Sequence, residues 1–321
     1  MSTITGQLQL LQLSPRYLSR SCCRNSPGTC GLQTADSQFG FKQAHGTEMA
    51  IFALKQTVDF YRNQDTPVYV CFLDAKKAFD RANGIRQGGQ LSPLLYNVYT
   101  DDLNHHFEAT GVGCYVGGAW VNSLSYADDM VLLAPTVTAL QILLEVCRAY
   151  AAPHDIVYNT TKTVCMLVRP KQSQGRYSTR VRLGNEELSF VQEFRYLGHV
   201  MTADCRDVND IKKQFMRQNA VGNMVVRKFS FASIEAKIQL FKSYCYPIYG
   251  CALWHHSYHN SIRQLTVSDT FKCLINVPRY TSSSLAFATN SADHINVVFH
   301  KFAYSLMSRV TASPNSIPIK I

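Results

Sequence analysis

Two apolar stretches that carry aspartates constrain the fold of this chain more than any other feature of the sequence. Val68–Leu73 is continuously apolar and leads directly into Asp74. Leu124–Leu133 is apolar on both sides of the adjacent Asp128 and Asp129. A short, continuously apolar run is typical of a strand buried on both faces, and an apolar stretch interrupted by a polar pair predicts a hairpin. We therefore expect Asp74 at the end of a central strand and the other two acids at a hairpin tip.

If the strand and the hairpin are neighbours in one sheet, the three acids converge. Clustered carboxylates raise one another's pKa values unless cations neutralise them, and ionised acids are rarely left unpaired in a core. Mg²⁺ binds to a few carboxylates together with phosphate oxygens, which is the arrangement of two-metal phosphoryl transfer. The alternative interpretation of Asp128 and Asp129 is a solvated turn. Asp101 and Asp102, in contrast, are expected to face solvent at the end of a helix.

Hydrophobic periodicity divides the rest of the chain into a mixed block and a helical block. The sequence predicts helices over Ala50–Tyr61, Ser92–Leu103 and Val137–Ala151, further strands over Val164–Val168 and Arg195–Val200, and then helices over Val208–Val226, Ser233–Tyr246 and Ile262–Ile275. We therefore expect an α+β domain over residues 39–203, with a sheet covered by helices on one face, and a basic helical region over residues 204–321.

Positive charge is concentrated in the last third of the chain. Residues 206–321 contain 14 Lys and Arg against 5 Asp and Glu, a net charge of +9, whereas residues 36–205 carry a net charge of −2. Basic surfaces bind phosphate backbones through the release of counterions, so nucleic acid is the first partner to consider. A basic, solvated helical face without a ligand is the alternative.

Several classes of protein and location are disfavoured by composition. No apolar run approaches the roughly 20 residues of a membrane-spanning helix, so no membrane partner is expected. The 11 Cys are irregularly spaced without a CxxC pair, which predicts reduced thiols in an intracellular protein of the nucleus or cytoplasm. Residues 1–38 are rich in Ser, Gln and Leu, with a faint similarity to a mitochondrial presequence. We interpret them as a poorly ordered leader or an unrelated fused segment.

The aspartates belong to a longer series of short motifs. The series runs Phe72–Asp80 (FLDAKKAFD), Asn83–Pro93 (NGIRQGGQLSP), Tyr126–Asp129 (YADD), Asn159–Val168 and Tyr196–Gly198 (YLG), and is preceded by Phe39–Phe41 and His45–Thr47. In this order the motifs resemble motifs A to E of the reverse transcriptases of non-LTR (LINE-type) retrotransposons and the segment that precedes motif A. The resemblance covers residues 39–280 and implies a right-hand polymerase palm-like sheet followed by a helical thumb-like region.

The resemblance implies a metal-dependent role for the acids. Asp74 and Asp128 would hold two Mg²⁺ (or Mn²⁺) ions, and Asp129 would support one of them. Lys162 would lie near the triphosphate as an acid or a countercharge, although a lone Lys is more often an ordinary surface residue. These four residues are the catalytic residues that the resemblance assigns.

A second group of residues is assigned by resemblance to the incoming nucleotide. Phe79 matches the aromatic position that excludes a ribose 2′-OH and so favours dNTPs. Gln87 and Gly88 would form a wall against which the template and the incoming base pair pack, because a chain without bulky side chains allows close approach. Arg86 would contact phosphate. The alternative for Gln87 and Gly88 is a simple turn that enters a helix.

The sequence departs from the family pattern between motifs A and B. Reverse transcriptases of this family carry several dozen residues there, but only Arg81 and Ala82 separate Asp80 from Asn83. The basic fingers motifs that the family carries before Phe39 are also not recognisable. We therefore expect a truncated copy that is internally deleted between motifs A and B.

Taken together, the resemblance implies an RNA-directed DNA polymerase that adds dNTPs to a DNA primer 3′-OH on an RNA template, with catalysis impaired by the deletion. A remnant that only binds nucleic acid is the first alternative, and salt-sensitive RNA binding without Mg²⁺-dependent extension would distinguish it. A domesticated scaffold protein is the second, and it predicts no specific affinity for a primer–template duplex.

Overall fold

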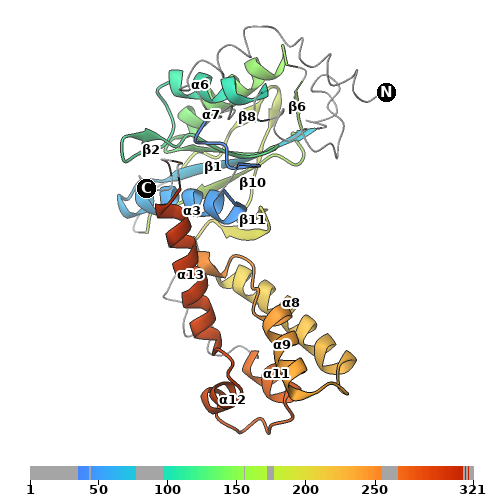
Figure 1. The fold of residues 1–321 in the computed structure, drawn as a ribbon. Coiled ribbons are helices and arrows are strands. Elements are labelled where there is room, and N and C mark those ends of the chain that lie inside the picture. Colours follow the sequence, from blue (N-terminus) through green and yellow to red (C-terminus); the bar gives the residue numbers. More distant parts are fainter. Residues whose placement is uncertain are drawn as a thin grey trace, which may run out of the picture. The chain divides into compact units, whose positions relative to one another are not determined.

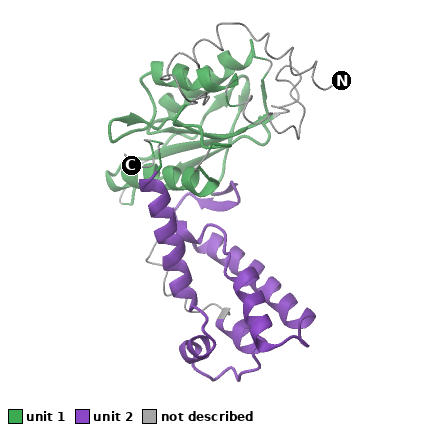
Figure 2. Ribbon diagram, viewed as in Figure 1, with its two compact units in different colours: residues 1–192, 313–321 green, residues 193–312 purple. Residues whose placement is uncertain are grey.

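The computed structural model describes residues 35–42, 45–76, 97, 99–154, 156–171, 177–254, 267–313, 315 and 317. The chain divides into two compact units, which Figure 2 colours separately. The first unit contains residues 1–192 and 313–321, and the second contains residues 193–312. The sequence placed this division at residue 203, because the strand predicted there was assigned to the first block.

A six-stranded sheet forms the centre of the first unit (Figure 1), and β1 (Val68–Lys76) is its central strand. β1 pairs antiparallel with β5 (Asp129–Ala134) on one side and with β7 (Val164–Val168) on the other. The outer strands are β4 (Ser123–Tyr126) beside β5 and β10 (Ser189–Phe190) beside β7, and β6 (Val157–Tyr158) pairs with the end of β1. The predicted central strand and the predicted hairpin are confirmed.

Helices cover both faces of this sheet, so the expectation of one covered face was wrong. Tyr69, Cys71 and Leu73 of β1 belong to a buried cluster with α6 (Asp101–Ala109) and α7 (Val137–Ala151). α3 (Thr47–Asn63) contacts β1 and β4 and lies on the other face (Figure 1). The reason is that β1 is apolar at successive positions, which requires cover on both faces.

The predicted helix boundaries are partly confirmed. α7 has the predicted bounds, and the Thr136 side chain caps it by accepting a hydrogen bond from the Ala139 amide. Asp101 and Asp102 begin α6 rather than end a helix, and the Asp101 carboxylate accepts a hydrogen bond from the Ala35 amide at 2.6 Å. Acids stabilise the first turn of a helix through its dipole, which explains the correction.

Two short hairpins complete the first unit. They are formed by β2 (Tyr115–Val116) with β3 (Ala119–Trp120) and by β8 (Arg182–Leu183) with β9 (Glu186–Glu187). None of the helices in the described part of the chain is long and apolar enough to cross a membrane.

The second unit begins with a hairpin and continues with helices. β11 (Glu193–Tyr196) and β12 (His199–Thr202) pair antiparallel around Leu197 and Gly198, so the single strand predicted over Arg195–Val200 is two strands. The helical elements that follow are α8 (Val208–Lys228), α9 (Ile234–Cys245), the short 3₁₀ helix η1 (Cys251–Leu253), α11 (Val267–Leu274), α12 (Ser283–Thr289) and α13 (Ile295–Thr311).

One aromatic-rich core holds these helices together. The rings of Phe271 and Phe287 stack with centroids 4.2 Å apart, and Phe241 lies beside them. Phe215 of α8 and Phe299 of α13 meet edge to face. The helical composition predicted for this region is therefore confirmed.

Candidate active site

A tight hairpin carries Asp128 at its tip. The last residue pair between β4 and β5 is Tyr126 with Asp129, which leaves only Ala127 and Asp128 in the turn. Ala127 has a φ of 57°, the left-handed conformation that glycine usually occupies at the first position of such a turn. An L-residue in this conformation costs roughly 1–2 kcal/mol. The backbone is therefore locally strained beside Asp128.

The register of the central sheet brings Asp74 to the same place. β1 and β5 pair so that Asp74 lies directly opposite Asp129. Asp128 precedes Asp129 in the turn, so one end of β1 and the hairpin tip together present three carboxylates. The sequence predicted this convergence on the condition that the strand and the hairpin are neighbours, and the β1–β5 pairing meets that condition.

The electrostatics of this site fit a group of carboxylates that make no ion pair with a basic side chain among the described residues. Burial raises the pKa of Asp128 above its ordinary value; its own backbone amide partly offsets this shift, and the charge of Asp74 adds to it. Loss of hydration, followed by the charges of Asp128 and Asp74, raises the pKa of Asp129 to about 6 even though its side chain is partly exposed. Each negative charge makes the next one less favourable.

A divalent cation would relieve this repulsion, because it favours the ionised form of every carboxylate around it. Within the described part of the chain, however, no group of three acidic, His or Cys side chains is arranged to hold an ion as it stands. The donor set and its charge therefore suit a metal, and metal binding would have to draw the carboxylates of Asp74, Asp128 and Asp129 together.

Lys162 lies in a turn that is attached to the main chain of Asp74. The Asn159 amide donates to the Asp74 carbonyl at 2.7 Å, and the Thr163 hydroxyl accepts from the Asp74 amide at 3.2 Å. Lys162 is exposed in the turn between them. Among the described residues its ammonium makes no ion pair with the three aspartates. The turn thus places Lys162 near the site without a direct contact.

The other candidate residues lie outside the described part of the chain. They are Phe79, Arg86, Gln87 and Gly88, which the resemblance assigned to the incoming nucleotide and the template. The short connection through Arg81 and Ala82 is outside it as well.

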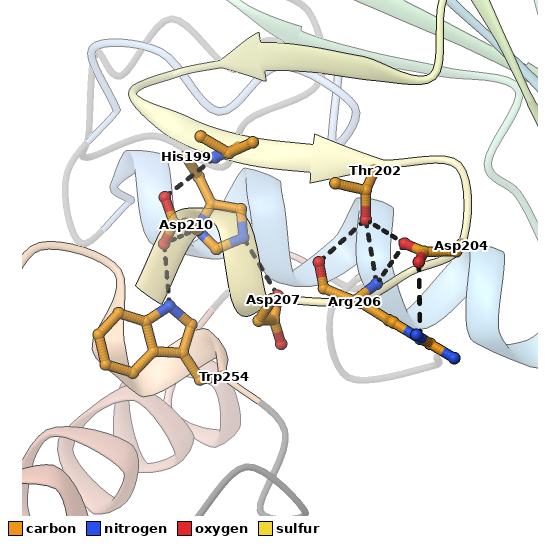
Figure 3. Close-up of polar contacts among 8 residues, drawn as sticks. His199, Thr202, Asp204, Arg206, Asp207, Asp210 and Trp254 are labelled. Atoms are coloured by element: carbon orange, nitrogen blue, oxygen red, sulfur yellow. Dashed lines mark hydrogen bonds and ion pairs between the residues drawn. The ribbon is translucent and has the colours of Figure 1, made fainter. Parts of the chain in front are cut away.

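A second polar cluster, which the sequence did not predict, is buried in the second unit (Figure 3). His199 of β12 is completely buried, and its Nδ1 lies 3.0 Å from an Asp210 carboxylate oxygen of α8. Its Nε2 lies 3.5 Å from the Asp207 carboxylate, which precedes α8. Asp210 also accepts hydrogen bonds from the Val200 amide at 3.1 Å and from the Trp254 indole at 2.9 Å.

This cluster has a clear electrostatic consequence. Burial would raise the pKa of Asp210, but the hydrogen bond and charge of His199, the Trp254 indole and the Val200 amide outweigh burial and hold that pKa below its ordinary value. The cluster joins the hairpin β11–β12 to the start of α8 and to the end of η1. This cluster has no local sequence pattern, because His199, Asp210 and Trp254 are widely spaced along the chain.

Comparison with known proteins relates part of the chain to one family. Residues 81–201 match the family described as reverse transcriptase (RNA-dependent DNA polymerase). The matched region contains Asp128, Asp129 and Lys162 but not Asp74. The position of Asp74 opposite Asp129 is therefore an independent indication that it belongs to the same site.

Relatives among characterised proteins point to retrotransposons. The chain is 31% identical over 158 residues to the Retrovirus-related Pol polyprotein from type-2 retrotransposable element R2DM of Drosophila melanogaster, a match that covers 44% of this chain and 14% of that protein. It is 21% identical over 341 residues to the RNA-directed DNA polymerase from mobile element jockey of Drosophila funebris, covering 87% of this chain and 36% of the relative. The chain thus spans a seventh to just over a third of these relatives. Residues 81–201 are therefore similar to reverse transcriptases, and these relatives are polymerase proteins of retrotransposable and mobile elements.

Proposed function

We propose that this chain is the palm and thumb of a retrotransposon reverse transcriptase, a class of enzyme that adds dNTPs to a DNA primer 3′-OH on an RNA template. The observation that carries the proposal is the pairing of Asp74 with Asp129 beside Asp128, within a chain related to RNA-directed DNA polymerases. Two strands that are far apart in sequence present their acids at one end of the sheet, as two-metal phosphoryl transfer requires.

In this proposal Asp74 and Asp128 hold two Mg²⁺ or Mn²⁺ ions, and Asp129 supports one of them. When bound, the ions activate the primer hydroxyl and neutralise charge on the transferred phosphoryl group. The β1–β5 register fixes the backbone positions of Asp74 and Asp129, and so it determines where these carboxylates can bind the ions. Lys162, exposed on the turn beside Asp74, supplies a mobile positive charge for the triphosphate.

The nucleotide-contacting residues are proposed from resemblance. Phe79 would exclude the ribose 2′-OH, Arg86 would contact phosphate, and Gln87 with Gly88 would pack against the template and the new base pair. In the sequence these four residues follow β1 and precede α6.

We further propose that this chain is an internally deleted copy with little or no polymerase activity. The alignment with the jockey polymerase supports this, because 87% of 321 residues is about 279, whereas the aligned stretch contains 341 positions. About 60 positions of the alignment therefore have no counterpart here. Between Asp80 and Asn83 an extended chain spans only about 10 Å. A displacement of about 1 Å can lower a rate on the order of a hundredfold.

Primer extension on an RNA template tests both parts of the proposal. The assay uses the purified chain with Mg²⁺ and dNTPs, and the Asp128→Ala variant as a control. Extension that is absent or barely above the control is expected. Robust extension that the control abolishes would contradict the proposed impairment while supporting the polymerase assignment.

Metal binding tests the assignment without activity. Mn²⁺ should raise the melting temperature of the wild-type chain by mass action, and replacement of Asp74 and Asp128 by Ala should remove the shift. Asp102→Ala is a matched control, because Asp102 lies in α6 outside the group of three acids. A metal-dependent shift that persists in the double variant would contradict the proposed site.

The charge of the second unit supports nucleic-acid binding as a function that does not require catalysis. Residues 193–312 contain 14 Lys and Arg against 7 Asp and Glu. Two of these acids, Asp207 and Asp210, are buried in the His199 cluster and contribute little to the surface. The exposed basic residues of α8 are Lys212, Arg217, Arg227 and Lys228. RNA binding by the chain should therefore weaken steeply with salt and show little sequence preference.

A further inference from the structure

The segment before α3 pairs with the strand that leads into the aspartate hairpin. β4 is an outer strand of the sheet, and Ser37–Gly40 runs parallel beside it. The Phe39 amide donates to the Ser125 carbonyl at 2.7 Å, and the Ser125 amide donates to the Ser37 carbonyl at 2.8 Å. These two hydrogen bonds place the side chain of Gln38 at the base of the hairpin tip.

Gln38 connects this segment to the turn itself. Its side chain is buried, with 3% of its surface exposed. Its Oε1 accepts hydrogen bonds from the Gly40 amide at 2.8 Å and from the Ala127 amide at 3.2 Å. Ala127 is the strained residue of the two-residue turn, and it is buried, with 8% of its surface exposed. A buried amide that loses its acceptor is costly, so this hydrogen bond favours the strained conformation.

Gly40 completes the contact by allowing close approach. A Cβ atom at Gly40 would lie 2.4 Å from the Ala127 nitrogen, a distance that real Cβ atoms do not reach. On its other side the Gly40 carbonyl accepts a hydrogen bond from the buried Asn97 side chain at 2.7 Å. The Gly40 backbone is thus held between Asn97 and the turn, and no larger residue fits.

We propose that Gln38 is a positioning residue that fixes the turn from which Asp128 reaches the metals, and that Gly40 is required for that contact. The proposal rests on the assignment of Asp128 to the polymerase site. It extends that assignment, because Gln38 and Gly40 precede the acids by dozens of residues and touch none of the three carboxylates in the described contacts. Asp128 adjoins Ala127 directly, so a turn released by loss of Gln38 would shift its carboxylate.

The direct test is amide hydrogen exchange at Ala127, measured by NMR. The Gln38→Met variant keeps the approximate volume of the side chain and removes the acceptor. Exchange at Ala127 should become about tenfold faster, which corresponds to the loss of one hydrogen bond. The matched control is Gln141→Met, because Gln141 also makes a pair of hydrogen bonds, to the Arg182 backbone, away from the hairpin. It should leave exchange at Ala127 within a factor of two.

Mn²⁺ affinity, read from the EPR signal of free Mn²⁺, gives a second measurement that a purely structural role would not move. Gln38→Met should weaken binding about tenfold. Gln141→Met should not, although it loses hydrogen bonds to the Arg182 backbone and to the Glu145 side chain. Gly40→Ala should weaken binding as well, because the added methyl displaces the turn. Unchanged affinity and unchanged Ala127 exchange in folded Gln38→Met would overturn the proposal.

The outcomes separate this inference from the proposed function. If the wild-type chain binds no Mn²⁺, the polymerase site fails, while exchange at Ala127 still reports on Gln38. If Gln38→Met does not fold, amide exchange of the wild-type chain tests whether Gln38 holds the turn. Its Ala127 amide should then be as protected as the Ser125 amide, and exchange at the rate of an exposed loop would refute the role of Gln38.

Discussion

Replacement of Asp210 by Ala tests how strongly the buried His199 cluster stabilises the second unit. The carboxylate accepts from the Val200 amide and the Trp254 indole and pairs with His199 at 3.0 Å. Alanine would leave these three polar groups buried without their acceptor. Hydrogen bonds to a charged group contribute about 1.5–3 kcal/mol each, but contributions within one network are not additive.

The expected decrease in the free energy of unfolding of Asp210→Ala depends on the burial of the carboxylate rather than on the number of its contacts. Removal of one partner of a buried ion pair costs about 3–5 kcal/mol, because the remaining groups stay desolvated. The matched control is Asp293→Ala, which breaks an ion pair with Lys301 of 2.6 Å. The side chains of that pair are 42% and 64% exposed, so its loss should cost less than about 1 kcal/mol.

Urea unfolding followed by tryptophan fluorescence measures both variants. The chain has two Trp, and a Trp120→Phe background leaves the signal of Trp254, which lies in the cluster itself. The low pKa of Asp210 means that its contribution is present above the ordinary value of 3.8 and is lost as the pH falls through the pKa of the folded state. The difference between wild type and Asp210→Ala should therefore shrink in acid. If Asp210→Ala lowers the free energy of unfolding at pH 7 by no more than Asp293→Ala does, this reasoning is refuted.

Three further substitutions test the hairpin tip and the YLG turn. Burial and the neighbouring charges raise the pKa of Asp129 to about 6, so the folded state binds this proton more tightly than the unfolded state does. The resulting stabilisation is complete below pH 3.8 and is lost as the pH rises through 6. Asp129→Asn should therefore raise the metal-free melting temperature at pH 8 and change it little at pH 3.5. Ala127→Gly should change the free energy of unfolding, measured in urea, by less than about 0.5 kcal/mol. Glycine relieves the left-handed strain, which stabilises the fold. The loss of the buried methyl group and the greater freedom of the unfolded chain destabilise it by a similar amount. In the same assay Gly198→Ala should lower the free energy of unfolding by about 1–3 kcal/mol, and by more than Gly184→Ala does. Both glycines have a positive φ, but only at Gly198 would the new Cβ meet another side chain, that of Tyr249 at 3.1 Å. Equal losses for the two glycine variants would contradict the crowding argument.

The central features of the fold could be predicted because they depend on local pattern. The apolar run before Asp74 needs cover on both faces and is therefore a central strand, whatever lies around it. The bounds of α7 follow from the periodicity of its buried residues. The convergence of Asp74 with Asp128 and Asp129 required one further assumption, that strand and hairpin are neighbours, and the register satisfies it.

The features that the sequence did not predict depend on contacts between distant segments. Gln38 was grouped with the leader because nothing local distinguishes it, whereas its role comes from Ser125 and Ala127, nearly ninety residues away. His199 and Asp210 similarly have no common periodicity, and only the packing of β12 on α8 brings them together. The YLG stretch was read as one strand, since the sequence does not reveal that Leu197 adopts a φ of 45° and reverses the chain.

The hairpin tip has two energetically unfavourable features, and they have a common explanation. Ala127 occupies a conformation suited to glycine, and Asp128 and Asp129 have raised pKa values beside Asp74. Both features are unfavourable in the metal-free chain, because an L-residue at the first position is strained and neutral residues at the next two would avoid the repulsion. Strain and repulsion at one turn persist only where surrounding contacts enforce them, as Gln38 and the β1–β5 register do here. Since a bound cation would turn the repulsion into attraction, the same residues that destabilise the free hairpin are those that would hold the metals of a polymerase.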